Sequence, residues 1–289
     1  MGIRHVFIHG LSGIAQSVFF RKPLAGGIFL CAFLLYSPLL ALACLVGTIA
    51  ANGTASLSKR PQATIVEGLY GYNGALLGLA FATFLPHDWL LWACIVFTAG
   101  LSVFLYDLFQ RFGIPPYTMP YVALAWVVLA IIRPDLGAAS ASAFNWTIPL
   151  TGMGQIFFLP SALGGLLILV GLATACPPRQ LVLTFVGAAI GCLPFAWLGE
   201  APYLTAGLIS TNASLSALGI LQVETRYPAL LSICFALGSA LLYPFLSALL
   251  GTVGLPALTF PFIATMWVGR SLMAFIEKRK RGVRQAVSS

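Results

Sequence analysis

Long apolar stretches, separated by short polar connections, occupy most of this chain. An α-helix needs about 20 mainly apolar residues to cross a bilayer. Three shorter apolar segments are interrupted by Gly, Asn, Ser or Thr, which suits either a span or a segment that enters the membrane and turns back. The pattern predicts an all-α integral membrane protein, with spans near 24–50, 89–109, 117–133, 155–175, 180–198, 229–250 and 255–276 and interrupted segments at 6–20, 64–86 and 203–223.

The composition excludes a water-soluble domain. Of the 289 residues, 60% are hydrophobic and 8% are charged, and the mean hydropathy is +0.97. Lys and Arg outnumber Asp and Glu by 15 to 7, and the excess lies outside the apolar stretches. That arrangement is typical of positive-inside topology and not of nucleic-acid binding. We therefore expect a multi-pass protein of the cell membrane, whose basic tail, 278–289, lies in the cytoplasm against anionic membrane lipids.

The polar residues show no catalytic or metal-binding pattern. The six cysteines occur singly, and His5 and His9 have helical i, i+4 spacing but only His87 to complete a site. No nucleophile–base order or phosphate-binding loop is present. We predict no enzyme activity, no cofactor and no metal site. Ionisable residues are too scarce in the apolar segments to favour a proton- or sodium-coupled pump.

Three motifs occur twice, in the same order, at an offset of 139 to 141 residues. Such self-similarity indicates a tandem duplication. If each copy contributes an odd number of spans, the second copy inserts upside down and a site forms between the copies. We predict an N-terminal repeat, 1–140, and a C-terminal repeat, 141–277. The matched motifs are Gln-x-x-Phe at Gln16 and Gln155, Gly-Leu-x₃-Asn-x-x-Leu at Gly68 and Gly207, and apolar-Pro-x-x-Thr-x-Pro-aromatic at Ile114 and Leu255.

The proline-bracketed threonines are the first candidates for pore residues. Prolines remove backbone donors and break a helix at membrane depth, which is tolerated only beside protein or water. The hydroxyls of Thr118 and Thr259 would then face the pore centre. The alternative is that each hydroxyl bonds to its own helix. The bracketing prolines are Pro116, Pro120, Pro256 and Pro261.

The glycine-dotted segments, 68–78 and 207–219, have the composition of short re-entrant helices whose free ends could line a selective path. Ordinary small-residue packing is the alternative. Within these motifs, we predict a structural role for Gly71, Asn73 and Asn212. The matched leucines, Leu69 and Leu208, are pore candidates.

Gln16 and Gln155 lie in apolar surroundings, where an unpaired amide costs roughly 2–7 kcal/mol, so each needs a partner. Phe19 and Phe158 follow on the same helix face and would place an aromatic wall beside each amide. Glu67 precedes the first glycine motif, where it is either a pore-mouth acceptor or a simple interfacial carboxylate.

Through these paired motifs the chain resembles the urea transporter family over almost its whole length. The resemblance implies a homotrimer in which each protomer has its own pore, built from two inverted repeats of five transmembrane helices plus one re-entrant pore helix each. It implies passive, channel-like transport of urea. Gln16, Glu67, Thr118, Thr259 and re-entrant carbonyls would accept the amide hydrogens of urea, and the apolar plates that hold it flat would be Phe19, Phe81, Leu85 and Phe158.

The second copy departs from the first in places. Its glycine-motif segment reads Ser210-Thr211-Asn212-Ala213-Ser214. At an offset of 139 residues from Phe81 and Leu85, the second copy has Ile220 and Glu224. A channel for ammonia, water or short amides remains an alternative, although the Asn-Pro-Ala pair of aquaporins is missing. An ion-coupled transporter is a second alternative, and a membrane enzyme a third.

Overall fold

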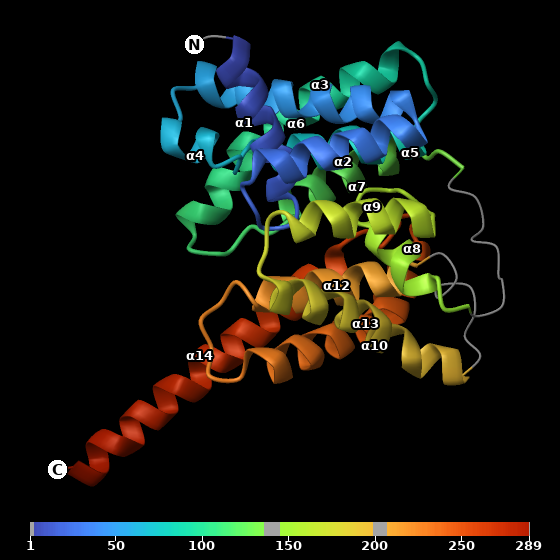
Figure 1. Cartoon of the computed structure of the whole chain (residues 1–289). Coiled ribbons are helices and arrows are strands. Elements are labelled where there is room, and N and C mark those ends of the chain that lie inside the picture. The colour runs from blue at the N-terminus through green and yellow to red at the C-terminus, as the bar shows by residue number, and fades with distance from the viewer. Residues whose placement is uncertain (1–2, 136–144, 199–206, 289) are drawn as a thin grey trace.

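The computed structural model describes residues 3–135, 145–198 and 207–288, and the regular structure within these ranges is helical (Figure 1). The first half contains α1 (Ile3–Gln16), α2 (Pro23–Tyr36), α3 (Pro38–Leu57), α4 (Gln62–Val66), α5 (Gly71–Phe84), α6 (Trp89–Arg111) and α7 (Met119–Ile132). The second half contains α8 (Ile148–Gln155), α9 (Ala162–Ala173), α10 (Pro178–Leu198), α12 (Leu208–Ile220), α13 (Pro228–Gly251) and α14 (Phe260–Ser288).

Four helices of the described ranges, α3, α6, α10 and α13, are long and apolar enough to cross a membrane. Large apolar side chains point outward from several helices: Leu35 of α2 is 77% exposed, Phe97 of α6 is 72% exposed and Val268 of α14 is 69% exposed. Such a surface is costly in water and suits contact with lipid. The predicted helical membrane protein is therefore what the structure supports.

Two predicted spans are wrong as single helices. The stretch 24–50 divides at Ser37, which is extended, and α3 then begins at Pro38. The stretch 155–175 divides between Gln155 and Ala162, and the Ser161 side chain caps the new helix by accepting from the Gly164 amide. In the first case, proline disfavours a helical residue before it and has no amide to donate, so it starts a helix more readily than it continues one.

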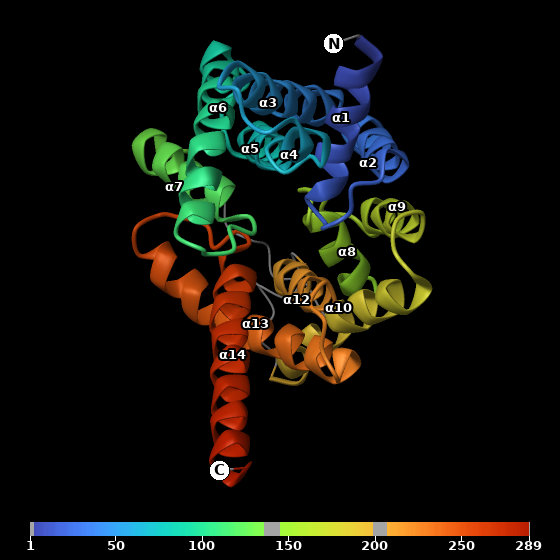
Figure 2. The ribbon, with the colours of Figure 1, turned by 90° about the vertical axis from the view of Figure 1, so that its left-hand side faces the viewer.

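The two glycine-rich helices, α5 and α12, form the centres of the two halves. Every residue of α5 from Gly71 to Ala82 is buried, as is every residue of α12 from Ile209 to Ile220. α5 packs against α1, α3, α6 and α7, and α12 packs against their counterparts α8, α10, α13 and α14. The two halves lie on opposite sides of the molecule in Figure 2, and α2 and α9 form one of the contacts between them.

Small residues let α3 and α5 approach closely. A Cβ built on Gly74 would lie 2.1 Å from the Gly47 carbonyl oxygen, and one built on Gly47 would lie 2.0 Å from the Gly74 carbonyl oxygen. Neither position can accept a side chain without separating the two backbones. In the second half, Gly187 and Gly191 of α10 approach the Cβ atoms of Ala217 and Ala213 of α12, each 2.5 Å from the added Cβ. Small-residue packing thus holds the central helix in both halves.

We predict that Gly74→Ala destabilises the protein by about 1–3 kcal/mol, because the added methyl overpacks a backbone contact. The thermal midpoint of the purified protein in detergent, followed by size-exclusion chromatography, would fall. Gly53→Ala is the matched control: Gly53 lies in α3, the helix that packs against α5, but nothing lies within 4 Å of its added Cβ. A Gly74→Ala midpoint equal to that of Gly53→Ala would contradict the prediction.

Candidate functional site

The two proline-bracketed threonines meet where the halves join. The hydroxyl oxygens of Thr118 and Thr259 lie 2.8 Å apart in a hydrogen bond, and the residues are 5% and 6% exposed. Each stands immediately before a helix, α7 or α14, whose second residue is Pro120 or Pro261. Proline is tolerated there because the first amides of a helix have no intrahelical partner. The two hydroxyls therefore bond to one another across the halves.

Two tryptophans reinforce the same junction by an exchange of hydrogen bonds. The indole nitrogen of Trp126 donates to the Pro256 carbonyl at 2.8 Å, and that of Trp267 donates to the Pro115 carbonyl at 2.8 Å. Each half thus satisfies a carbonyl in the broken segment of the other, as a two-fold contact requires. Sequence analysis missed both residues, although their spacing equals that of Thr118 and Thr259.

The predicted structural asparagines tie each central helix to the helix that follows the threonine. Asn73 Oδ1 accepts from the Tyr121 amide at 3.2 Å, and Asn212 Oδ1 accepts from the Phe262 amide at 3.1 Å. Both amides belong to the first turn of a helix, where backbone donors need outside partners. Gly71 is the first residue of α5 and lies close to the Asn52 side chain. A Cβ built on Gly71 would lie 3.0 Å from Asn52 Oδ1.

The carbonyl before each threonine is satisfied differently in the two halves. In the second half, Asn212 Nδ2 donates to the Leu258 carbonyl at 3.0 Å. In the first half, the Tyr72 hydroxyl donates to the Tyr117 carbonyl instead. The position that matches Tyr72 is Thr211, whose hydroxyl donates to the Gly152 carbonyl at 2.8 Å. The two copies therefore keep one backbone geometry with different side chains.

Left-handed backbone recurs at matching positions. Phe19 and Phe158, the last residues of the Gln-x-x-Phe motifs, have φ of 70° and 60°, and Tyr117 and Leu258 have φ of 43° and 50°. A non-glycine residue in this region is strained and needs surrounding structure to hold it. The same two turns are held in both halves.

A cavity of about 180 Å³ lies beside the threonine junction, on the side of the first half. At roughly 30 Å³ for each water molecule, this is the volume of about six waters, which is enough for a small solute. Five predicted residues line it: Gln16, Phe19, Leu69, Pro116 and Thr118. Sequence analysis missed the others, which are Ser17, Tyr72, Tyr106, Gln110, Pro115 and Tyr117.

The cavity wall combines helix ends with aromatic rings. Gln16 is the last residue of α1 and Ser17 follows it, whereas Leu69 precedes α5 and Tyr72 is its second residue. The Phe262 ring packs edge-on against Phe19 at 6.0 Å and against Tyr117 at 5.5 Å between centroids.

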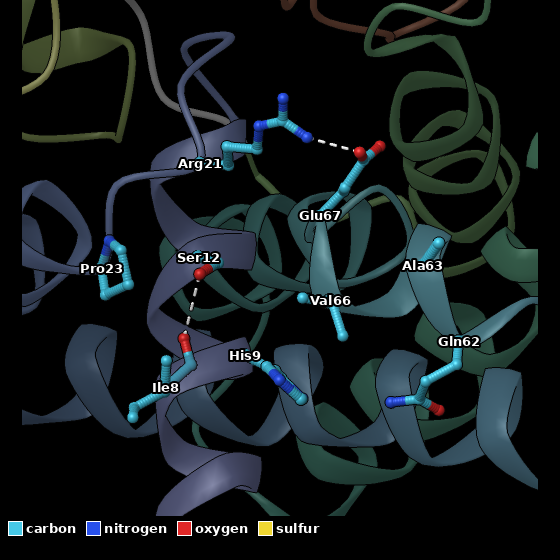
Figure 3. A pocket seen from close by; sticks show the side chains of 9 residues that line it. All are labelled: Ile8, His9, Ser12, Arg21, Pro23, Gln62, Ala63, Val66 and Glu67. Carbon is cyan, nitrogen blue, oxygen red and sulfur yellow. Dashed lines mark hydrogen bonds and ion pairs between the residues drawn. The ribbon is translucent and has the colours of Figure 1, made fainter.

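Glu67 does not line this cavity. Its carboxylate forms an ion pair with Arg21, and their side chains are 43% and 65% exposed. Figure 3 shows the Arg21 guanidinium turned toward Glu67 at one edge of a separate pocket of about 580 Å³, with His9 and Ser12 along its wall. An exposed pair of this kind stabilises a protein by about 0–1 kcal/mol. Its place fits the interfacial-carboxylate alternative.

The remaining predicted site residues lie outside the 180 Å³ cavity. Gln155 ends α8 and Leu208 begins α12, and both are partly buried. The Phe158 ring packs edge-on against Phe84, with centroids 5.7 Å apart. Two apolar residues, Phe81 and Leu85, are 0% and 4% exposed in the core. Sequence analysis missed Phe84, whose neighbour across the halves could not be read from its position in the chain.

No group of three His, Cys, Asp or Glu residues gathers within the part of the chain that the structure describes. What the site offers is uncharged: hydroxyl and amide oxygens, helix ends and aromatic rings.

Comparison with known proteins agrees with this geometry. The chain is 28% identical to urea transporter 1 of the sheep Ovis aries and to that of the goat Capra hircus, each over 295 aligned positions that cover 89% of this chain and 74% of the relative. Urea transporter 1 of the rat Rattus norvegicus is 29% identical over 294 positions, with the same coverage. A family model described as urea transporter matches residues 8–272. Because that match covers most of the sequence, the chain belongs to the urea transporter family.

Proposed function

We propose that this protein conducts urea passively across the membrane, through a pore at the interface of its two halves. The observation that carries the proposal is the Thr118–Thr259 hydroxyl pair, buried at the junction with an oxygen spacing of 2.8 Å. Family membership and relatives named urea transporter support the substrate.

The chemistry of the junction suits urea. Urea is planar and neutral, and its N–H groups lose hydrogen bonds to water when they leave solution. Each threonine oxygen has two lone pairs, so most acceptor sites of the pair stay available after the two hydroxyls bond to one another. Such acceptors replace water without creating a tight site, and conduction requires weak binding at several places. Because the two hydroxyls touch, urea passes beside the pair and not between its members.

The cavity extends this path toward one mouth. The Gln16 amide, the Tyr72 hydroxyl and the end of α1 supply polar atoms, while Phe19 supplies an apolar plate. A volume near 180 Å³ favours small solutes. Gln155 and Phe158 are proposed to serve the path from the other half, with Leu208, Phe81 and Leu85 as further apolar lining.

The proposed architecture is two inverted repeats, 1–140 and 141–277, each with five spans and one re-entrant helix. The recurring packing around α5 and α12 and the reciprocal tryptophan bonds support it. The sequence pattern assigned the re-entrant role to 68–78 and 207–219. We propose α1 and α8 in their place, since both end at a Gln-x-x-Phe turn. The eight residues of α8 extend about 12 Å, far less than the roughly 30 Å of a bilayer core.

The protein is proposed to form a homotrimer in the cell membrane, with the basic segment 278–289 in the cytoplasm.

We predict that Thr118→Val and Thr259→Val each lower urea flux about three- to tenfold, because each removes one pore oxygen worth about 1 kcal/mol while preserving shape. Stopped-flow urea permeability of proteoliposomes measures this. The double variant should lose less than the product of the single losses, since the hydroxyls interact directly.

Thr98→Val is the matched control for both variants. The Thr98 hydroxyl donates to the Cys94 carbonyl of its own helix at 2.7 Å and lies away from the junction. Wild-type flux in both junction variants, with monodisperse protein, would remove the threonines from the pathway.

We predict that urea flux is unchanged by a protonophore and by replacing sodium with choline, because a passive pore has no coupling ion. Internal urea should approach the external concentration and stop there. Accumulation above the external concentration, abolished by either treatment, would favour the ion-coupled alternative. Parallel measurements with acetamide, water and ammonium separate urea from the other channel substrates.

A further inference from the structure

Arg270 places a cationic group at the rim of the cavity. Its Nη1 donates to the Tyr117 hydroxyl at 3.0 Å, and Tyr117 lines the cavity beside Gln16 and Thr118. Arg270 itself is exposed and is not one of the lining residues. Its charge therefore lies at the mouth, in contact with the wall but outside the path.

The helix that carries Arg270 is fixed relative to this mouth. Trp267 lies one turn earlier, on the same face of α14. Its indole nitrogen donates to the Pro115 carbonyl at 2.8 Å, and its ring stacks on Phe109 with centroids 6.0 Å apart and planes inclined by 22°. Pro115 also lines the cavity. Two contacts one turn apart thus hold the guanidinium in place.

No described acidic side chain neutralises this charge. Among the side chains that the structure describes, the two ion pairs join Arg21 to Glu67 and Arg60 to Asp107, and neither includes Arg270. The group that faces Arg270 is a neutral phenol.

An oxygen-lined pore does not by itself exclude small cations, and a positive charge at this place does. Hydroxyl, amide and carbonyl oxygens bind cations at least as readily as they bind the N–H groups of a neutral amide, and cation channels are lined by the same atoms. Size does not help against a cation shaped like urea. A fixed positive charge at the mouth repels such a cation and leaves a neutral solute unaffected.

We infer that Arg270 is a charge filter that excludes small planar cations, guanidinium above all, from a pathway that admits urea. This inference rests on the proposed function. Guanidinium is the sharpest probe, because it is planar and close to urea in size, carries N–H groups in place of the oxygen and remains charged at neutral pH.

The experiment compares fluxes of radiolabelled guanidinium and urea through the same proteoliposomes. The ratio of the two fluxes does not depend on how much folded protein each preparation contains. We expect a low ratio for the wild type and about a tenfold higher ratio for Arg270→Gln, with urea flux unchanged. Arg270→Lys, which keeps the charge, should retain a low ratio.

Arg226→Gln is the matched charge control. Arg226 is exposed in the loop before α13, over the ring of Tyr227, so its loss should leave the ratio at the wild-type value. Raising the ionic strength should raise the wild-type ratio, because an exposed charge is screened by salt. The salt series needs no variant and tests the filter even if Arg270→Gln fails to insert.

A ratio that is insensitive both to Arg270→Gln and to salt would overturn the inference, as would a wild-type protein that passes guanidinium as fast as urea. Wild-type urea flux no higher than that of protein-free liposomes would instead overturn the proposed function. The two failures are therefore distinguishable.

Discussion

The structure depends on how the backbone polar groups of two broken segments find partners where the halves join. Irregular chain inside a bilayer survives only where its N–H and C=O groups find partners. Here the helix that follows each threonine supplies a donor to the broken segment of the other half: the indole nitrogens of Trp126 and Trp267 donate to proline carbonyls in both directions. The threonine hydroxyls also bond to one another. In the proposed pore, a solute would bind the polar groups that remain after this exchange.

The glycine-rich central helices make this junction possible. Because α5 and α12 are buried along almost their whole lengths, each can hold an asparagine rigidly enough to cap the helix that follows the threonine. Close approach of small residues to neighbouring backbones, as at Gly47 and Gly74, gives the same rigidity without large side chains. Packing and polar recognition are therefore coupled at these helices.

The two halves share a backbone plan but have different side chains around the path. Tyr72 stands where the second half has Thr211, and Arg270 reaches across to Tyr117 of the first half. In the channel that we propose, the lining is therefore asymmetric, with a charged group at one mouth and a neutral junction between the halves.

The sequence by itself determined the helical membrane class, the three paired motifs and the position of the threonine pair, because hydrophobic runs and prolines act on the local chain. It also located Gln16, Phe19 and Leu69 at one cavity, since their motif marked them. It misjudged helix continuity at Ser37 and after Gln155, where hydropathy alone does not reveal an extended or left-handed residue.

Only the tertiary structure decided that Glu67 pairs with Arg21 away from the cavity, that Tyr72 and Tyr117 line it, and that Trp126 and Trp267 exchange bonds across the halves. These contacts join residues that are far apart in the chain or that belong to different halves. Their existence depends on how whole helices are placed relative to one another, which no local pattern of residues encodes.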